Sequence, residues 1–350
     1  MSKTVYVGMS GGVDSSLSAA LVKEQGFDVV GVYMKNWAKD LPGFDCPWRD
    51  DLADAKRVAV QLGIKLEVLD FQEQYKTKVV DYMLESYKLG ITPNPDIMCN
   101  QEIKFKLFLD VALESGADMI ATGHYARTQD GKLLTAIDAN KDQTYFLYRV
   151  SSEALSNTLF PLGELAKKQV REMAAKRGLV TANKKESMGI CFVGKVGIKD
   201  FLMQYVDPNQ GDIIDTNGKV LGQHDGAIFY TIGQRHGLSV GGGLPYYVVD
   251  KDMDSNTLTV TSDIDDNRLW HSSAELVSWH SINQDPDPNE TYMIRNRHRA
   301  ELVAGKIELR GDGRALVSFS DPTRAITPGQ SLVFYQGETV IGGGIIGLKK

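Results

Sequence analysis

The chain has 350 residues, of which 42% are hydrophobic, and it carries a formal net charge of −6. This length predicts about two domains with sizeable cores, and no apolar run reaches the ~18 residues that a membrane span needs. The acidic balance argues against a nucleic-acid partner unless basic residues cluster locally. Because the chain opens with Met1-Ser2-Lys3 and no apolar signal region follows, we expect a cytoplasmic protein with no membrane partner.

The first predicted element is a strand over residues 4–9, which a polar loop and a helical pattern follow. The loop, Ser10–Ser16, contains two adjacent glycines that let the backbone approach an anion closely. The N–H groups at the helix start and the hydroxyls of Ser10, Ser15 and Ser16 supply donors. The loop lacks the Gly-Lys-Ser/Thr ending of a Walker A loop and the spaced glycines of the dinucleotide-binding fingerprint. We therefore predict a cradle for pyrophosphate.

Strands and helices alternate over the following hundred residues. This alternation is typical of an α/β fold with a doubly wound parallel sheet. Ligands of such sheets bind at the carboxyl ends of the strands, so we expect the cradle, Met34 and Gly123 to lie on one ligand-binding rim. The predicted strands are Asp28–Met34, Lys65–Leu69 and Ala117–Thr122, and the helical patterns cover about 51–59, 74–89 and 101–115.

The second half of the chain is rich in short β patterns. Beyond residue 211 they alternate with turn sequences such as Thr216–Gly218, and helical periodicity disappears. The proline-punctuated stretch Asp285–Pro288 suggests a further boundary. More strands are predicted at about 291–296, 301–309, 314–319 and 331–335. We predict a catalytic domain over residues 1–200, a small β domain over 201–270 and a C-terminal β-barrel over 271–350.

Three cysteines, Cys46, Cys99 and Cys191, fit a reducing compartment better than a disulfide framework. Cys99 precedes a predicted helix, and a helix N-terminus lowers the pKa of a thiol below its free value of ~8.5. A structural role as a small buried hydrophobe stays open, above all for Cys46. Cys191 lies in Gly189–Val196, which has the frame of a Walker A loop, but Val196 replaces the Ser or Thr that binds magnesium. We therefore exclude a phosphate loop there.

An ordered set of motifs resembles that of the tRNA-specific 2-thiouridylases, a family of PP-loop ATP pyrophosphatases. The N-terminal loop is similar to the PP-loop pattern SGG-x-DS, and the likeness extends over nearly the whole chain. One position departs from the family pattern, since His298 stands where an aromatic residue such as tyrosine is expected. The likeness is carried by Gly8–Ser15, Asn94–Asn100, Thr122–Tyr125, Lys141–Leu147, Met188–Phe192, Tyr230–Arg235, Arg297–Arg299 and Pro328–Gln330.

The resemblance implies a catalytic domain of the adenine nucleotide alpha hydrolase-like class, which binds ATP with Mg²⁺ and has no permanent metal site of its own. Asp14 would lie near the magnesium, and its alternative role is to stabilise the positive end of the helix dipole. The implied ATP-binding residues are Gly8, Met9, Ser10, Gly11, Gly12, Val13, Asp14, Ser15, Met34 and Gly123.

The implied activity is ATP-dependent 2-thiolation of the wobble uridine of tRNA. ATP transfers AMP to the 2-oxygen of the base and releases pyrophosphate, and a persulfide on Cys191 then supplies the sulfur. In this family Cys99 corresponds to the nucleophile, which releases the sulfur or forms a transient disulfide with Cys191. Asp96 would move a proton near the base, with turn formation as its alternative role.

The resemblance also implies partners, namely tRNAs that accept lysine, glutamate or glutamine, and a cysteine desulfurase or sulfur-relay protein. The target base must leave its stack and enter a pocket. The implied tRNA-binding residues are Asn94, Pro95, Asp96, His124, Lys141, Asp142, Gln143, Arg297, His298 and Gln330. Further basic residues would hold the tRNA stem or else form a solvated face: Lys167, Lys168, Arg171, Lys184, Lys185, Arg295 and Arg299.

Two other functions stay open. A PP-loop also serves amide-forming or tRNA-lysidine-forming ligases, which need no cysteine pair. The fold could instead belong to an adenine-nucleotide sensor or a non-catalytic RNA-binding module. A ligase would stay active with alanine at Cys99 and Cys191, and a binding module would release no pyrophosphate with any tRNA.

Overall fold

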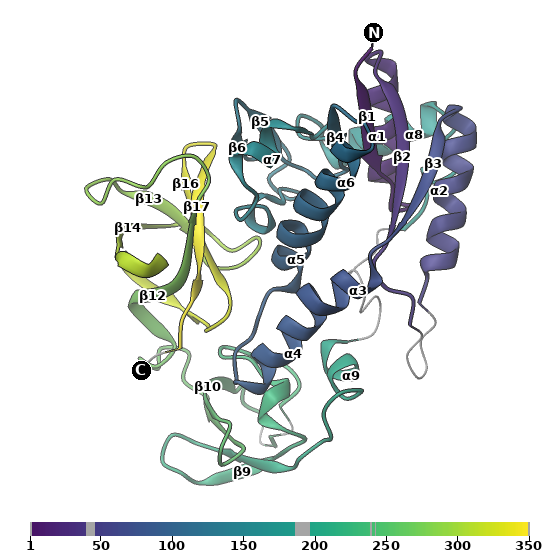
Figure 1. The fold of residues 1–350 in the computed structure, drawn as a ribbon. Helices are drawn as coiled ribbons and strands as arrows, with labels where there is room; N and C mark the ends of the chain where they lie inside the picture. The colour runs from purple at the N-terminus through teal and green to yellow at the C-terminus, as the bar shows by residue number, and fades with distance from the viewer. Residues whose placement is uncertain (1, 40–45, 186–196, 239, 242, 349–350) are drawn as a thin grey trace.

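The computed structural model describes residues 2–39, 46–185, 197–238, 240–241 and 243–348. Figure 1 shows three units: a sheet flanked by helices near the N-terminus, a smaller β unit below it, and a β-barrel at its side. Within these ranges, no helix has both the length and the apolar character needed to cross a membrane. Cys191 and its whole motif, Gly189–Val196, lie outside the described residues.

The N-terminal unit is built on a parallel sheet with the strand order β3-β2-β1-β4-β7. The chain moves outward from β1 through β2 to β3 and then returns to β4 on the other side of β1, so the order reverses between β1 and β4. The predicted doubly wound α/β fold is confirmed, and ligands bind such sheets at this reversal. The strands are β1 (Thr4–Gly8), β2 (Asp28–Lys35), β3 (Lys65–Asp70), β4 (Met119–Ala121) and β7 (Thr158–Leu159).

Helices cover both faces of this sheet. Val5 and Val7 of β1 pack with one group of helices, and Tyr6 between them packs with the other, because side chains alternate along a strand. The first group is α1 (Val13–Glu24), α2 (Trp48–Leu62) and α8 (Lys167–Lys176). The second group consists of two continuous segments: α3 (Gln72–Tyr75), the π-helical turn η1 (Lys76–Val80) and α4 (Asp81–Lys88), then α5 (Pro95–Met98), the π-helical turn η2 (Cys99–Leu107) and α6 (Phe108–Glu114).

The helix that contains Cys99 starts earlier than the sequence predicted. It begins at Pro95, and Asn94 precedes it in an extended conformation. Proline suits the first helical position because the N–H that it lacks would have no partner there. The expectation that Cys99 precedes a helix is therefore wrong: Cys99 is the first residue of η2 and is 1% exposed.

The middle unit is the predicted small β domain, with the strand order β10-β11-β8-β9. The predicted turn at Thr216–Gly218 connects β8 to β9. Buried residues of this unit, including Ile213 and Val248, belong to the same hydrophobic cluster as α4, so the unit packs against the end of that helix (Figure 1). Its elements are α9 (Ile198–Leu202), β8 (Gly211–Ile214), β9 (Val220–His224), η4 (Ala227–Phe229), β10 (Tyr247–Asp252) and β11 (Thr257–Thr261).

The C-terminal unit is a closed antiparallel barrel, since the strands follow the order β12-β15-β14-β13-β16-β17 and β17 pairs back with β12. The predicted barrel is confirmed, but the boundary suggested at Asp285–Pro288 is wrong. That stretch connects β12 to β13 inside the barrel, so its prolines mark a loop. The strands are β12 (Trp270–Ser281), β13 (Tyr292–Arg295), β14 (Val303–Leu309), β15 (Ala315–Arg324), β16 (Ser331–Gln336) and β17 (Thr339–Ile346), with η5 (Gly311–Gly313) between β14 and β15.

A hairpin of the N-terminal unit extends the barrel sheet. It lies between β4 and β7 in the chain, and its second strand pairs with β17. The first and last units therefore share a continuous set of backbone hydrogen bonds. The hairpin strands are β5 (Arg127–Gln129) and β6 (Lys132–Leu134), and η3 (Thr144–Phe146) and α7 (Ser152–Ser156) lead from them to β7.

Candidate active site

The loop between β1 and α1 is held in a tight, internally bonded shape. Gly11 has φ +75°, and a Cβ at this position would lie 2.2 Å from the backbone oxygen of Asp51, so only glycine fits. The Ser15 hydroxyl accepts from the Ser10 N–H at 3.1 Å. Ser16 is fully buried and its hydroxyl donates to the Gly12 oxygen at 2.7 Å, so it supports the loop rather than adding the donor expected from the sequence.

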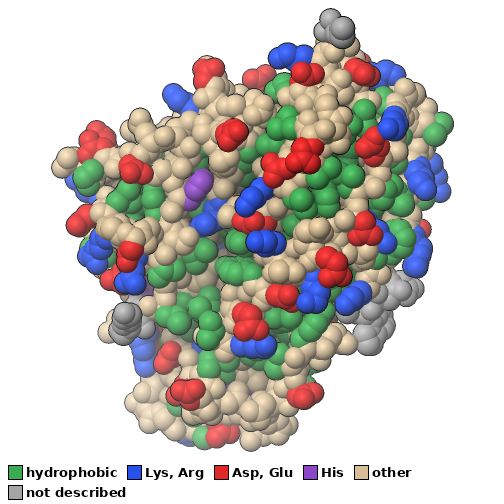
Figure 2. All heavy atoms as spheres, viewed as in Figure 1, with side chains coloured by type: hydrophobic (Ala, Val, Ile, Leu, Met, Phe, Trp, Pro, Cys, Tyr) green, Lys and Arg blue, Asp and Glu red, His purple; other side chains and the backbone are tan. Residues whose placement is uncertain are grey.

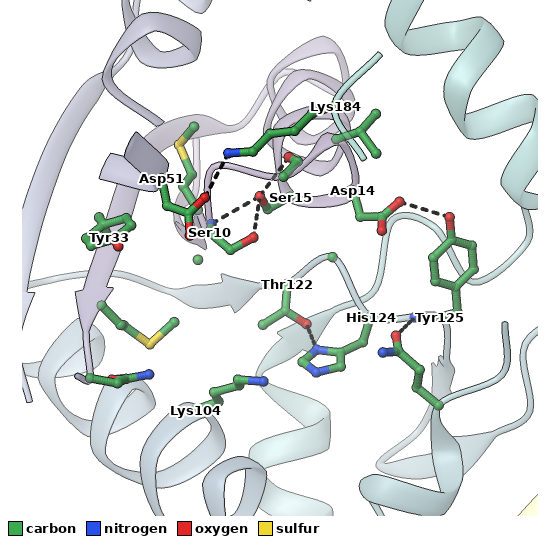
Figure 3. A pocket seen from close by; sticks show the side chains of 18 of the residues that line it. Ser10, Asp14, Ser15, Tyr33, Asp51, Lys104, Thr122, His124, Tyr125 and Lys184 are labelled. Carbon is green, nitrogen blue, oxygen red and sulfur yellow. Dashed lines mark hydrogen bonds and ion pairs between the residues drawn. The ribbon is translucent and has the colours of Figure 1, made fainter. Parts of the chain in front are cut away.

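This loop forms one wall of a cavity of ≈ 490 Å³ at the carboxyl ends of β1, β2 and β4 (Figure 3). Among the predicted ATP-binding residues, Gly11 is the exception, because it faces α2 instead of the cavity. Sequence reasoning therefore located the rim of the sheet correctly. The predicted residues that line the cavity are Gly8, Met9, Ser10, Gly12, Val13, Asp14, Ser15, Met34 and Gly123.

Asp14 points into the cavity from the first turn of α1 (Figure 3). Its carboxylate accepts from the Lys167 ammonium at 2.7 and 2.8 Å and from the Tyr125 hydroxyl at 3.0 Å. Lys167 is the first residue of α8, and its side chain is only 13% exposed. A lysine that the sequence suggested for the tRNA stem thus lies beside the phosphate cradle.

A second lysine is held at the same end of the cavity. The Lys184 ammonium lies 2.8 Å from an Asp51 oxygen and 2.6 Å from an Asp54 oxygen, both on α2 (Figure 3). Burial alone would lower the pKa of Lys184, but the hydrogen bonds and charges of the two carboxylates outweigh burial and raise it. Lys184 is therefore a permanent cation that ties α2 to the segment after α8.

The described lining residues include more cations than carboxylates. The carboxylates are those of Asp14 and Asp51. Figure 2 shows acidic and basic side chains interspersed over the face drawn, so the excess of positive charge is a local property of the cavity. Such an excess suits a polyanion such as a nucleotide triphosphate. The cations are Lys104, Lys141, Lys167, Lys184, Lys185 and Arg299.

Two neutral histidines line the cavity as well. His124 shares a hydrogen bond of 2.8 Å with the Thr122 hydroxyl, and burial, together with the charge of Lys104, holds its pKa well below 6.5. His298, from the loop between β13 and β14, packs its ring 4.6 Å from that of Phe146. Burial, reinforced by the charges of neighbouring arginines, lowers the pKa of His298 to about 4. The barrel therefore contributes an uncharged ring to the cavity.

Comparison with known proteins gives the family. The profile described as "tRNA methyl transferase HUP domain" matches residues 3–195, and those described as "tRNA methyl transferase PRC-barrel domain" and "Aminomethyltransferase beta-barrel domain" match 199–262 and 272–346. A protein named tRNA-specific 2-thiouridylase MnmA, from Idiomarina loihiensis, is 48% identical over 99% of this chain and 96% of its own. One of the same name from Listeria innocua is 48% identical over 98% and 94%. The chain belongs to the tRNA-specific 2-thiouridylase family, a family of enzymes.

Solved structures show a more distant likeness to this chain. A structure titled as a 4-thiouridine synthetase–RNA complex with bound ATP aligns with a TM-score of 0.38 and 16% identity, over 58% of this chain and 50% of that one. The NMN synthetase from Francisella tularensis aligns with a TM-score of 0.36 and 16% identity, over 53% and 66%.

Two of the predicted catalytic residues, Cys99 and Asp96, are not among the described residues that line the cavity, and the third, Cys191, lies outside the described residues. Cys99 is buried in η2, whose Lys104 lines the cavity. Asp96 is partly buried one turn earlier, and burial raises its pKa while the charge of Lys104 opposes the rise. Cys46 is buried and its thiol donates to the Trp37 oxygen at 3.8 Å, in keeping with a structural role.

The predicted tRNA-binding residues fall into two groups. His124, Lys141, Gln143 and His298 line the cavity. The others make internal contacts, and their tRNA contacts stay predictions: the Gln330 amide donates to the Thr92 oxygen at 2.9 Å, just before Asn94 and Pro95. Buried Asp142 accepts from the Ala136 N–H at 2.7 Å and the Thr144 hydroxyl at 2.6 Å, and Arg297 donates to the Ile232 oxygen at 3.2 Å.

Several lining residues were missed by the sequence reasoning. Tyr125 was quoted only as part of a motif, and Lys104 was hidden in an ordinary helical pattern. Lys104 is five residues after Cys99, and a π-helical turn brings residues at this spacing to neighbouring positions, but no sequence pattern announced that turn. Asn36 and Trp48 also line the cavity, and both lie between the predicted strand of residues 28–34 and the predicted helix of about 51–59, so no predicted element included them.

Proposed function

We propose that this member of the family thiolates the 2-position of the wobble uridine of tRNA, with ATP as the activating substrate. The observation that carries the proposal is that one cavity joins the phosphate cradle to Lys104 of η2, which also bears Cys99, and to His298 of the barrel. A nucleotide bound by the cradle would thus reach a base that approaches between the two domains.

The first half of the reaction activates the base. The uracil 2-oxygen attacks the α-phosphorus of ATP, and pyrophosphate leaves into the cradle, where backbone N–H groups and the lining lysines stabilise its charge. Magnesium would neutralise phosphate charge when it arrives with ATP, and Asp14 is the carboxylate that fits it. Among the described residues no three His, Cys, Asp or Glu side chains are grouped to hold a metal ion.

The second half replaces oxygen with sulfur. The terminal sulfur of a persulfide on Cys191 attacks C2 of the adenylated uridine, and AMP leaves with the former 2-oxygen. The Cys99 thiolate then attacks the Cys191 sulfur, which releases 2-thiouridine and forms a Cys99–Cys191 disulfide that an external thiol reduces. Asp96 would move the proton near the base, because its raised pKa lets it exchange protons closer to neutral pH.

The proposed partners are those that the family resemblance implies. The tRNA substrates are those that accept lysine, glutamate and glutamine, and the persulfide is supplied by a cysteine desulfurase or a sulfur-relay protein in the cytoplasm. Phosphates of the stem would meet the exposed Arg299 beside the cavity, as the tRNA backbone needs cations to hold its register.

Thiolation of unmodified lysine tRNA tests the proposal. Wild type, Cys99→Ser, Cys191→Ser and Cys46→Ser are supplied with Mg-ATP and a persulfide donor, and thiolated tRNA is read as retardation on a mercury-containing gel. We expect retardation with wild type and Cys46→Ser and none with the other two. Pyrophosphate release without retardation in wild type would reject the sulfur step and favour a ligase.

A further inference from the structure

Helix α8 is capped by a residue that lies far away in the sequence. Ala166 precedes the helix, and its side chain has no atom that accepts a hydrogen bond. The Asp138 carboxylate takes this role: Oδ2 accepts from the Lys167 N–H at 2.9 Å, and Oδ1 accepts from the Asn140 N–H at 3.1 Å. A carboxylate is favoured at this end of a helix, because the first N–H groups have no partner within the helix and the dipole is positive there.

The backbone of Asp138 is held by a turn with bonds of its own. The Asp138 backbone oxygen accepts from the N–H groups of Lys141 and Asp142, both at 2.9 Å. The Asp142 carboxylate accepts from the Ala136 N–H at 2.7 Å and from the Thr144 hydroxyl at 2.6 Å. None of these bonds uses the Asp138 side chain, so a substitution of that side chain should leave the turn in place.

The Asp138 carboxylate fixes the backbone from which Lys167 reaches the cavity. Lys167 is the first residue of α8, and its ammonium donates to the Asp14 carboxylate at 2.7 and 2.8 Å beside the cradle. Asp138 is not among the described residues that line this cavity. We therefore expect the Asp138 side chain to act on a bound ligand through Lys167.

We infer that Asp138 is a positioning residue, which sets the start of α8 so that the Lys167 ammonium meets the phosphates of a bound nucleotide triphosphate. The inference rests on the proposed use of ATP. Position matters for such a group, because a misplacement of about 1 Å can lower a reaction rate about 100-fold. The other lysine at this end of the cavity, Lys184, is held by α2 and does not depend on this cap.

Calorimetric titration of the full chain with Mg-ATP, without tRNA or a sulfur donor, tests the inference. Asp138→Ala removes the cap and should weaken ATP binding about five- to tenfold. Asp138→Asn keeps an acceptor for the Lys167 N–H, so it should weaken binding by no more than about twofold. Lys167→Met removes the ammonium and should weaken binding about 10- to 100-fold. In that background, Asp138→Ala should lose no more than a further factor of about two, because it acts through Lys167.

Ser151→Ala is the matched control. The Ser151 hydroxyl accepts from the Ala154 N–H at 3.2 Å and so caps α7, and Ser151 is not among the described residues that line the cavity. Loss of either cap should lower the melting temperature by about 2–4 °C. Only Asp138→Ala should also weaken ATP binding, so the comparison separates positioning of Lys167 from a general loss of stability.

The inference is overturned if Asp138→Ala binds ATP as tightly as wild type, or if Ser151→Ala weakens ATP binding as much as Asp138→Ala does. It is also overturned if the separate losses of Asp138→Ala and Lys167→Met multiply in the double variant. ATP binding that depends on Asp138 without thiolation of tRNA would reject the proposed function and leave the inference standing. Absence of ATP binding by wild type would overturn both.

Discussion

Asp14 shows how one carboxylate is prepared for a charged ligand. Two contacts hold it in place, the Lys167 ammonium at 2.7 Å and the Tyr125 hydroxyl at 3.0 Å. Asp14→Asn would remove the charge that a magnesium-bearing nucleotide needs, so we expect tRNA-dependent pyrophosphate release to fall about 100-fold. Tyr125→Phe removes one hydrogen bond and should lose less than about tenfold. A coupled pyrophosphate assay compares them, and equal losses would contradict a charge-based role for Asp14.

The lowered pKa of His298 makes the free energy of unfolding depend on pH. Its pKa is lowered from 6.5 to about 4 by burial and by Arg299 and Arg295, so between these values the unfolded chain binds a proton that the folded chain does not. The stability that this difference supplies is complete above pH 6.5 and is lost as the pH falls toward 4. His298→Tyr, which introduces the residue type that the resemblance led us to expect here, should therefore reduce the loss of unfolding free energy between pH 7 and pH 5.

Urea unfolding at the two pH values measures this effect. The matched control is His236→Tyr. His236 is exposed, so this variant makes the same change of residue type at the surface. We expect the control to keep the wild-type pH dependence. A wild-type pH dependence in His298→Tyr would show that this histidine titrates alike in the folded and unfolded chains.

At the scale of elements, the phosphate cradle and the sheet were predictable because their signals are local. The strand of residues 4–8, the glycine pair and the helix start are adjacent in the chain, and each has its own pattern. The start of the Cys99 helix was misread because Asn94 and Pro95 suit both a turn and a helix N-terminus. The pair of Asp14 and Lys167 spans 153 positions, and no local pattern reports on a contact of that separation.

The packing of the cradle on α2 makes a prediction about two glycines. Gly11 and Gly26 both have positive φ, +75° and +89°, but a Cβ at Gly11 would lie 2.2 Å from the Asp51 oxygen, while at Gly26 no described atom lies within 4 Å. Gly26→Ala should lose only the conformational term, about 1–2 kcal/mol. Gly11→Ala should lose more and also displace the loop from α2, which weakens ATP binding. Urea unfolding and ATP titration test both, and wild-type ATP affinity in Gly11→Ala would refute this link.

At the scale of the whole molecule, the barrel is anchored so that its loop reaches the cavity. The Tyr145 hydroxyl donates to the Ser331 oxygen at 3.1 Å, and the Tyr148 and Ser331 hydroxyls share a hydrogen bond of 3.0 Å. With the β6–β17 pairing, these contacts hold the β13–β14 loop, which carries His298, against the N-terminal unit. The change from alternating strand and helix patterns to short β patterns indicated the order of the three units. The contacts between the units join residues more than 180 positions apart, and no sequence pattern predicts them.

Two arginines of the β13–β14 loop have different contacts, so their variants should distinguish anchoring of the barrel from binding of RNA. Arg297 donates to the Ile232 oxygen of the middle unit at 3.2 Å and to the Thr327 hydroxyl at 3.0 Å, whereas Arg299 is exposed and lines the cavity. Arg297→Met should lower the free energy of unfolding by about 2–3 kcal/mol, because it removes the hydrogen bonds that the guanidinium donates at the contact between the barrel and the middle unit. Arg299→Met should keep the stability and reduce the slope of log Kd for tRNA against log salt concentration by about 1.

Thermal unfolding and filter binding over a range of salt concentrations measure the two effects separately. If Arg297→Met keeps its stability and loses tRNA affinity at every salt concentration, the guanidinium contributes to tRNA binding rather than to the stability of the contact between the units. Nη2 alone donates to the Ile232 oxygen and the Thr327 hydroxyl, and a guanidinium has further N–H donors on Nε and Nη1, so the family-implied contact at Arg297 would not require the barrel to move when tRNA binds.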